Sequence, residues 1–174
     1  MKSPLNLSKE VVMNMLRRCL DYLDRNHVAY SHSIHPPAYT AREVAAADRI
    51  PAYSLAKTVV YFGDTGYGMA VVPADRTVDF AEVRRLMGLS FIRLSTEVEL
   101  VDLFPTCEVG AMPPLGNLFG LPVLVDVNIE AQEFIAFNAG THRDVIRMSF
   151  SDFAKQVNPL IADFAVIESA AAGN

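Results

Sequence analysis

The sequence contains no tryptophan and only two cysteines, Cys19 and Cys107, in 174 residues. Two isolated cysteines do not supply a disulfide framework or a metal-ligand cluster, so we expect both to be small core residues. No apolar run reaches the ~18 residues that suggest a membrane-spanning helix, and the N-terminus lacks the apolar stretch of a secretory signal. The sequence therefore predicts a cytoplasmic protein without a structural metal.

An excess of positive charge is also absent, because 20 acidic residues outnumber 15 basic ones and leave a net charge of -5. This balance argues against strong sequence-independent binding to duplex DNA, which needs many Lys or Arg contacts to phosphates. It still allows brief contact with a single-stranded nucleic acid end through a local basic patch. Lys9, Arg17, Arg18 and Arg25 are candidates for such a patch, although the same residues fit the solvated face of an amphipathic helix.

Common motifs of catalysis and cofactor binding are missing: the sequence has no Walker A loop, no G-x-G-x-x-G, no H-E-x-x-H and no G-x-S-x-G. The histidines are scattered, at positions 27, 32, 35 and 142, and they lack the spacing of a metal site. We therefore predict no metal and no cofactor.

What the chain does contain is a globular composition, 51% hydrophobic and 20% charged, of a length that fits one domain with a substantial core. Strands and short helices are interspersed, which favours a single α+β domain with a mixed sheet and outer helices. The expected helices are residues 8–26 with Ser8 as N-cap, a short one after Thr40, 80–87, 97–104 and 151–157. The expected strands are residues 27–35, a hairpin over 56–73, 91–95, 121–126, 133–140 and 144–150, with a last apolar piece at 160–165 and a frayed tail at 168–174.

Two features could carry chemistry. The stretch "SLAKTVVYF" reads as a strand in which Lys57 shares a face with Leu55, Val59 and Tyr61. An ammonium group beside apolar side chains needs a partner, or its head must reach water.

The second feature is the loop "VGAMPPLGNLFGLP", residues 109–122, which is almost uncharged and is made stiff by its prolines, while its glycines permit unusual backbone conformations. Such a loop is either an ordinary connection or a pocket wall that presents N–H donors.

Taken together, Lys57, "VGAMPPLG", "LPVLVD" and "FNAGTHRDVIRMSFSDFAKQV" resemble the YbaK/ProX family of aminoacyl-tRNA deacylases, relatives of the editing domain of bacterial prolyl-tRNA synthetase. The resemblance covers roughly residues 28–166. It implies a mixed, mostly antiparallel, curled and barrel-like sheet surrounded by helices. It also implies metal-independent hydrolysis of the ester between a wrong amino acid and the tRNA 3′ end, foremost tRNA-Pro carrying Ala, Cys or Ser. The implied partners are the aminoacyl-tRNA 3′ end and, as a further candidate, prolyl-tRNA synthetase, with no membrane and no DNA.

The resemblance also implies a set of site residues. Lys57 matches the functional lysine, which we expect to anchor and polarise the substrate while loop amides hold the developing oxyanion. Gly110 and Pro114 match a G-x-x-x-P loop, and Asp126 matches the acidic residue that ends the next strand. The implied catalytic residues are Lys57, Gly110 and His142, and the implied substrate-binding residues are Thr58, Met112, Pro113, Pro114, Gly116, Asp126, Gly140 and Thr141.

Alternatives stay open at this point. Asp126 also fits a carboxylate that caps backbone amides, and His142 fits an ordinary turn residue. The sequence departs from the family pattern at Thr58, at Pro113 and at Thr141-His142-Arg143. These departures motivate a second reading, a non-catalytic ligand-binding or regulatory module on the same fold. A third reading, a hydrolase with Cys19 or Cys107 as nucleophile, lacks a recognisable base partner.

Overall fold

The computed structural model describes the backbone of residues 4–167 and the side chains of residues 15–167, so the tail at 168–174 lies outside the described residues. The helices are α1 (Pro4–Arg25), α2 (Ala41–Ala47), α3 (Phe80–Met87), α4 (Glu97–Leu103), α5 (Val127–Glu130) and α6 (Phe150–Val157), with 3-10 turns η1 (Ala52–Ser54) and η2 (Gly116–Leu118). The strands are β1 (Tyr30–Ile34), β2 (Leu55–Gly63), β3 (Gly66–Pro73), β4 (Arg76–Val78), β5 (Ile92–Leu94), β6 (Val123–Asp126), β7 (Phe134–Asn138), β8 (Asp144–Ser149), β9 (Leu160–Ala162) and β10 (Ala165–Ile167).

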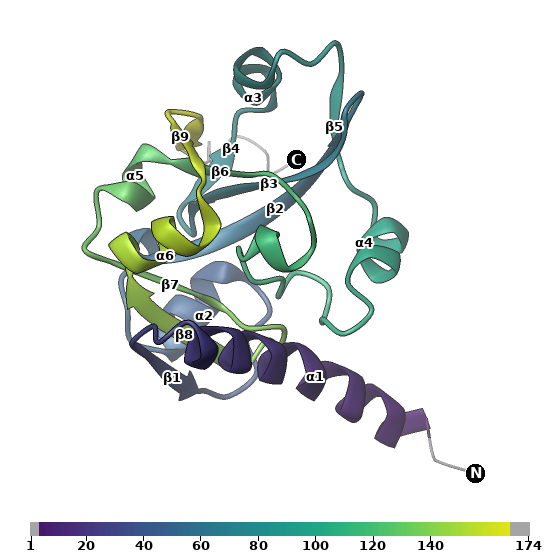
Figure 1. Cartoon of the computed structure of the whole chain (residues 1–174), viewed down its shortest axis with the longest axis vertical. Coiled ribbons are helices and arrows are strands. Elements are labelled where there is room, and N and C mark those ends of the chain that lie inside the picture. The colour runs from purple at the N-terminus through teal and green to yellow at the C-terminus, as the bar shows by residue number, and fades with distance from the viewer. Residues whose placement is uncertain (1–3, 168–174) are drawn as a thin grey trace, which may run out of the picture.

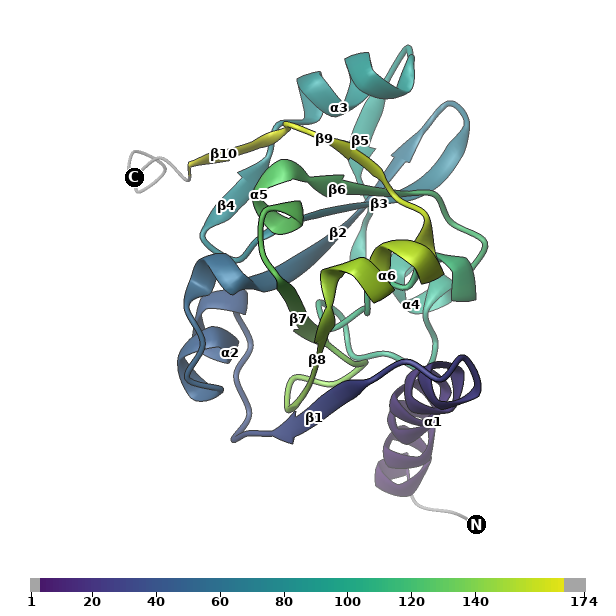
Figure 2. The same cartoon turned by 60° about the vertical axis from the view of Figure 1, so that its left-hand side comes forward.

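One large mixed sheet forms the centre of the molecule, in the order β1-β8-β7-β2-β3-β6-β9, with β5 also paired to β2. The β1–β8, β7–β8, β2–β3 and β2–β5 pairs are antiparallel, whereas β2–β7, β3–β6 and β6–β9 are parallel. The predicted α+β domain with a mostly antiparallel sheet is confirmed. The sheet is open rather than a closed barrel, because β1 and β9 are its two edges (Figures 1 and 2).

Most elements follow from local signals in the sequence. The predicted hairpin is confirmed, with β2 and β3 in register from Ala56↔Pro73 to Gly63↔Gly66. Thr40 and Thr96 cap α2 and α4 through complete capping boxes with the glutamates three residues later. Gly88 ends α3 in the left-handed conformation, φ 64°, as its position predicts.

The N-terminal helix differs from the prediction. α1 begins at Pro4, so Ser8 lies inside the helix and is not its N-cap. Proline is favoured in the first turn of a helix, because its missing N–H would have no helical partner there.

Two strands were not predicted: β4 and β10 form a separate antiparallel pair (Figure 2).

Both faces of the sheet are covered. On one face, α1 and α6 pack through Met15, Leu23 and Phe153 against strand residues such as Val60. On the other face, α3 contributes Val83 to a cluster with Tyr61, while α2 packs against Leu55. The alternation of β2 side chains therefore divides its residues between two cores. No helix within residues 4–167 is long and apolar enough to cross a lipid bilayer.

Candidate functional site

The site begins with a gap in the pairing of β2. On one edge, β2 pairs with β7 only through Leu55 and Ala56, and with β5 only from Tyr61 onward. Between these contacts the edge carries no strand, although the Ser95 N–H donates to the Val60 carbonyl at 3.0 Å. Backbone groups of alternate residues point to the same edge, so the N–H and C=O of Thr58 also face this gap. The gap leaves backbone polar groups available to a ligand.

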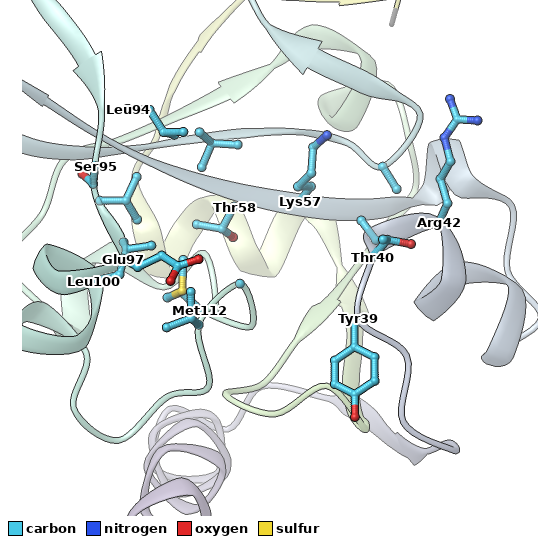
Figure 3. Close-up of a pocket in the computed structure, with 16 residues that line it drawn as sticks. Tyr39, Thr40, Arg42, Lys57, Thr58, Leu94, Ser95, Glu97, Leu100 and Met112 are labelled. Atoms are coloured by element: carbon cyan, nitrogen blue, oxygen red, sulfur yellow. The ribbon is translucent and has the colours of Figure 1, made fainter. Parts of the chain in front are cut away.

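A pocket of about 560 Å³ lies over this gap. That volume falls within the range of small-molecule sites, ~300–1,000 Å³. Its walls come from α2 and the segment before it, from β2, from β5 and α4, and from the predicted loop (Figure 3). The lining residues are Tyr39, Thr40, Ala41, Arg42, Lys57, Thr58, Val59, Val60, Ala74, Leu94, Ser95, Glu97, Leu100, Val109, Gly110 and Met112.

Lys57 is half-buried, and its ammonium donates to the Arg76 carbonyl of β4 at 2.7 Å. This contact explains how an ammonium group shares a face of β2 with Leu55, Val59 and Tyr61: the aliphatic stem lies on the sheet and a carbonyl accepts from the head. Figure 3 shows the Lys57 side chain pointing to the opposite side of β2 from Thr58. Lys57 therefore lines the pocket from one face of the sheet while the loop lines it from the other.

Two hydroxyl groups in the pocket wall are buried without a partner. Thr58 Oγ1 and Ser95 Oγ make no hydrogen bond within the described residues, and Ser95 is 6% exposed. A buried hydroxyl without a hydrogen bond is destabilising by ~1–3 kcal/mol. Such unsatisfied groups in a pocket are expected where a ligand completes their hydrogen bonding.

Two glutamates at the start of α4 have different roles. Glu99 accepts from the Thr96 N–H at 2.8 Å and binds the Arg93 guanidinium through two contacts, at 2.9 and 2.7 Å. These hydrogen bonds hold the pKa of the Glu99 carboxyl well below its usual range, with the Arg93 contact as the largest cause. Glu97, by contrast, lines the pocket, and Figure 3 shows its carboxylate pointing toward the side where Thr58 and Met112 lie.

The loop after Val109 is fixed by glycines and buried prolines. Gly110 has φ +88°, a conformation that favours glycine, and Pro113 and Pro114 are buried. A Cβ at Gly116 would lie 2.3 Å from Val123 Cγ2, so Gly116 is required for packing and does not line the pocket. Within the described residues no hydrogen bond engages the N–H of Gly110 or Met112. The start of this loop, from Val109 to Met112, therefore lines the pocket and has backbone N–H groups without hydrogen-bond partners among the described residues, as predicted.

Gly140, Thr141 and His142 support this loop from behind. Gly140 is paired to it through Glu108 N to Gly140 O and Gly140 N to Ala111 O, both at 2.9 Å. His142 Nε2 lies 2.8 Å from the Val109 carbonyl, and the Thr141 hydroxyl donates to Asp144. None of the three lines the pocket, so the structure brings them to the outer side of the loop.

Asp126 lies elsewhere. Its carboxylate is fully buried and accepts from the Asn128 N–H at 2.9 Å and from the N–H groups of Phe164 and Ala165 at 2.9 and 2.8 Å. It thus holds the C-terminal segment against β6. The structure does not bring Asp126 to the pocket, and its contacts match the alternative of a carboxylate that caps backbone amides.

The two cysteines are also separate from the pocket lining. Burial raises the pKa of Cys19 and of Cys107 to about 12, which keeps both thiols protonated at neutral pH. A protonated, buried thiol is a poor nucleophile. Within residues 15–167, no group of three or more His, Cys, Asp or Glu side chains is arranged to hold a metal ion.

The sequence did not indicate five polar or aromatic residues of the pocket: Tyr39, Thr40, Arg42, Ser95 and Glu97. Thr40 and Glu97 lie in helix-capping segments that the sequence does reveal. The capping box at Thr96 and Glu99 fixes the start of α4, but it does not reveal which side of the helix faces a pocket.

The fold and the pocket together define a small α+β domain with a pocket at the unpaired edge of a strand. A model of the aminoacyl-tRNA editing domain matches residues 35–156. The chain therefore belongs to the aminoacyl-tRNA editing domain family, which confirms the resemblance read from the sequence.

Individual relatives agree with this assignment. A proline--tRNA ligase from Fervidobacterium nodosum is 29% identical over 91 residues, covering 52% of this chain and 16% of the ligase. The chain spans 14% to 18% of the length of the proline--tRNA ligases that it matches. A solved structure of a proposed trans-editing enzyme for prolyl tRNA synthetase has a TM-score of 0.73 at 23% identity, over 97% of this chain and 100% of that chain. A proposed signal transduction protein from Marinobacter aquaeolei VT8 has a TM-score of 0.66 at 20% identity, over 95% of this chain and 31% of that chain. Both structures share the fold.

Proposed function

We propose that this protein is a trans-editing aminoacyl-tRNA deacylase. It hydrolyses the ester that joins a wrong amino acid to the 3′ end of a tRNA, foremost tRNA-Pro carrying Ala, Cys or Ser. The observation that supports it most directly is the unpaired edge of β2 inside a pocket, in a chain of the aminoacyl-tRNA editing family. That edge and the adjoining loop offer N–H donors to an ester carbonyl.

In this proposal, a water molecule attacks the ester carbonyl, and the resulting oxyanion accepts from the free amides of Thr58, Gly110 or Met112. The C–O bond to the ribose then breaks, the ribose oxygen takes up a proton, and the amino acid leaves as its carboxylate. The neighbouring ribose hydroxyl orients the water, so no protein base and no metal is required. Preorganised N–H donors of this kind contribute ~100-fold to 1,000-fold in rate.

Lys57 has an anchoring role in this mechanism. Its half-buried ammonium and the nearby Arg42 guanidinium both line the pocket, and both suit the phosphates and ribose of a tRNA 3′ end. His142 acts indirectly by holding the Val109 carbonyl, 2.8 Å from its Nε2, and thereby the Gly110 amide.

The apolar part of the pocket supports selection by size. Met112, Leu100 and Val60 are among its lining residues, and Met112 is 5% exposed. A synthetase cannot strongly reject a smaller amino acid, because one methylene is worth only ~1–3 kcal/mol. A second hydrolytic site that accepts small side chains improves the accuracy of charging.

The proposed partners follow from this role. The tRNA 3′ end binds transiently, and prolyl-tRNA synthetase in the cytoplasm supplies the mischarged tRNA. With a net charge of -5, the contact is confined to the acceptor end. A steep fall of affinity with salt, with many ions released, would contradict this.

Single-turnover deacylation of a panel of aminoacyl-tRNAs tests the proposal. Wild type is compared with Lys57→Ala and with the control Lys155→Ala, which removes an exposed lysine from α6. We expect selective hydrolysis of Ala-, Cys- or Ser-tRNA-Pro, roughly 100-fold slower in Lys57→Ala and unchanged in the control. Stability of all three esters with excess wild type would refute deacylation.

A second candidate is a non-catalytic ligand-binding or regulatory module. Its support is the shared fold with the proposed signal transduction protein, in which this fold makes up 31% of the chain. It predicts ligand binding without hydrolysis of any aminoacyl ester, and equal binding by wild type and Lys57→Ala. A clear loss of binding in Lys57→Ala would count against it.

A further inference from the structure

We propose that Glu97 forms a subsite for the α-ammonium group of the bound amino acid, so that the pocket selects a free α-amine over an acylated one. This inference rests on the proposed function and names the chemistry of its substrate. An amino acid esterified to a tRNA end has lost its carboxylate but retains the ammonium. A pocket that recognises this ammonium group needs a hydrogen-bond acceptor, preferably an anionic one, beside its apolar wall.

The first observation is the state of the Glu97 carboxylate. Glu97 opens α4, lines the pocket, and points into it (Figure 3). Within the part of the chain that the structure describes, no hydrogen bond or ion pair engages this carboxylate. The helix cap is formed instead by Thr96 and Glu99, and Arg93 binds Glu99. Glu99 is therefore engaged in the cap, whereas Glu97, an exposed acidic residue in the first turn of α4 that also complements the helix dipole, keeps its carboxylate accessible to a ligand.

The second observation is a set of acceptors around the same space. An ammonium carries three N–H donors. The Thr58 carbonyl faces the unpaired edge of β2, and the Thr58 hydroxyl is buried without a partner. Together with the Glu97 carboxylate, these two oxygens supply three acceptors at the wall formed by β2 and α4. Ser95 adds a further unpartnered hydroxyl at the β5 end of the pocket.

The positions of the charged residues in the pocket indicate how the substrate would be oriented. Arg42 and Lys57 lie toward the α2 side in Figure 3, while Glu97 lies on the α4 side. An aminoacylated tRNA end has the same polarity, with phosphates at one side of the ester and an ammonium at the other. The substrate would thus lie along β2, with its ester near Thr58 and Gly110.

This arrangement has a functional consequence. Acylation of the α-amine removes its charge and adds bulk next to Glu97. The pocket would therefore spare tRNAs that carry an N-acylated amino acid or a peptide. Selection of the amine is separate from selection of the side chain by Met112 and Leu100.

Equilibrium binding of a stable analogue tests the inference without requiring turnover. The probe is adenosine 5′-phosphate with alanine joined through a 3′-amide, used with either a free or an acetylated α-amine. Wild type, Glu97→Gln and Asp102→Asn are titrated at pH 6.5. Asp102→Asn is the matched control, because it removes one exposed charge from the same helix outside the pocket.

We expect wild type and Asp102→Asn to prefer the free amine about tenfold, as one charge-assisted contact would give. Glu97→Gln should lose most of that preference while its affinity for the acetylated probe stays within about twofold. An unchanged preference in Glu97→Gln, no preference in wild type, or no binding of either probe by wild type would each overturn the subsite.

Deacylation of Ala-tRNA-Pro and N-acetyl-Ala-tRNA-Pro separates this inference from the proposed function. Binding that depends on Glu97 without hydrolysis would refute the deacylase and keep the amine subsite. Equal hydrolysis of both esters would keep the deacylase and refute the subsite.

Discussion

Lys57 and Thr58 are consecutive residues of β2 whose side chains lie on opposite faces of the sheet, and yet both line one pocket. This is possible only because the edge of β2 is open at this point, between its contacts with β7 and β5. A ligand at an open strand edge can reach both faces as well as the backbone between them. The gap therefore joins a basic residue on one face to apolar and acidic residues on the other.

Gly140→Ala should destabilise the fold through α1. Gly140 has φ +89°, and an added Cβ would lie 2.6 Å from Met15 Cγ. We expect a loss of about 3 kcal/mol in the free energy of unfolding, from backbone strain plus overpacking. Urea denaturation measures it. Gly120→Ala is the control, because Gly120 has φ +66° but nothing within 4 Å of an added Cβ. Equal losses in both variants would contradict a role for the contact with α1.

Asp126→Asn should separate stability from function. The Asp126 carboxylate accepts from the Phe164 and Ala165 amides, and an Asn side chain provides only one acceptor oxygen. We expect a loss of about 2 kcal/mol in stability, because a buried amide loses its partner. Binding of the amide-linked probe by the folded fraction should stay unchanged. A selective loss of binding at full stability would instead give Asp126 the substrate-binding role implied by the family resemblance.

Glu99→Gln should remove part of the acid sensitivity of the protein. The hydrogen bonds from Arg93 and Thr96 lower the pKa of Glu99 from 4.5. The folded state therefore binds this proton less readily than the unfolded chain, and the stabilisation is present above pH 4.5 and is lost as the pH falls through the lowered pKa. Urea midpoints should thus differ between wild type and Glu99→Gln at pH 7 and converge toward pH 2. A difference that does not change with pH would contradict this linkage, and Asp102→Asn controls for loss of charge.

Alkylating reagents should leave the native protein unmodified and active. Burial raises the pKa of both Cys19 and Cys107 to about 12, so at pH 7.5 almost no thiolate is present. We expect slow reaction with iodoacetamide in the native state and rapid reaction of both thiols in urea, followed by mass spectrometry. Rapid native modification that abolishes deacylation would revive a cysteine nucleophile.

The sequence predicted those elements whose signals are local. The capping boxes at Thr40 and Thr96 define helix starts within four residues, and the β2–β3 hairpin needs only a turn between two apolar runs. By contrast, β4 and β10 are three residues each and pair across nearly the whole second half of the chain. Neither has enough residues to show a period of its own.

The same distinction applies to the site. Lys57 and Gly110 stand out in sequence because a strand lysine and a glycine-proline loop are unusual. Ser95 and Glu97 reach the pocket only because β5 stops pairing with β2 at Tyr61, which no local pattern indicates. Asp126 was expected in the site because it matches the acidic residue of the family pattern, and its partners, the amides at 164 and 165, follow 38 and 39 residues later, where no local pattern indicates them.

Thr58→Val should stabilise the protein and impair its function together. The Thr58 hydroxyl is buried without a partner, and valine has nearly the same shape without the polar group. We expect a gain of about 1 kcal/mol in unfolding free energy, because an unsatisfied hydroxyl is removed. If that hydroxyl accepts from the substrate ammonium, affinity for the free-amine probe should fall about fivefold while affinity for the acetylated probe is retained. Ser95→Ala provides the comparison of a second unpartnered hydroxyl in the same wall, at the β5 end. Loss of stability in Thr58→Val would mean that the hydroxyl already has a partner in the free protein, and unchanged binding of both probes would exclude it from the amine subsite.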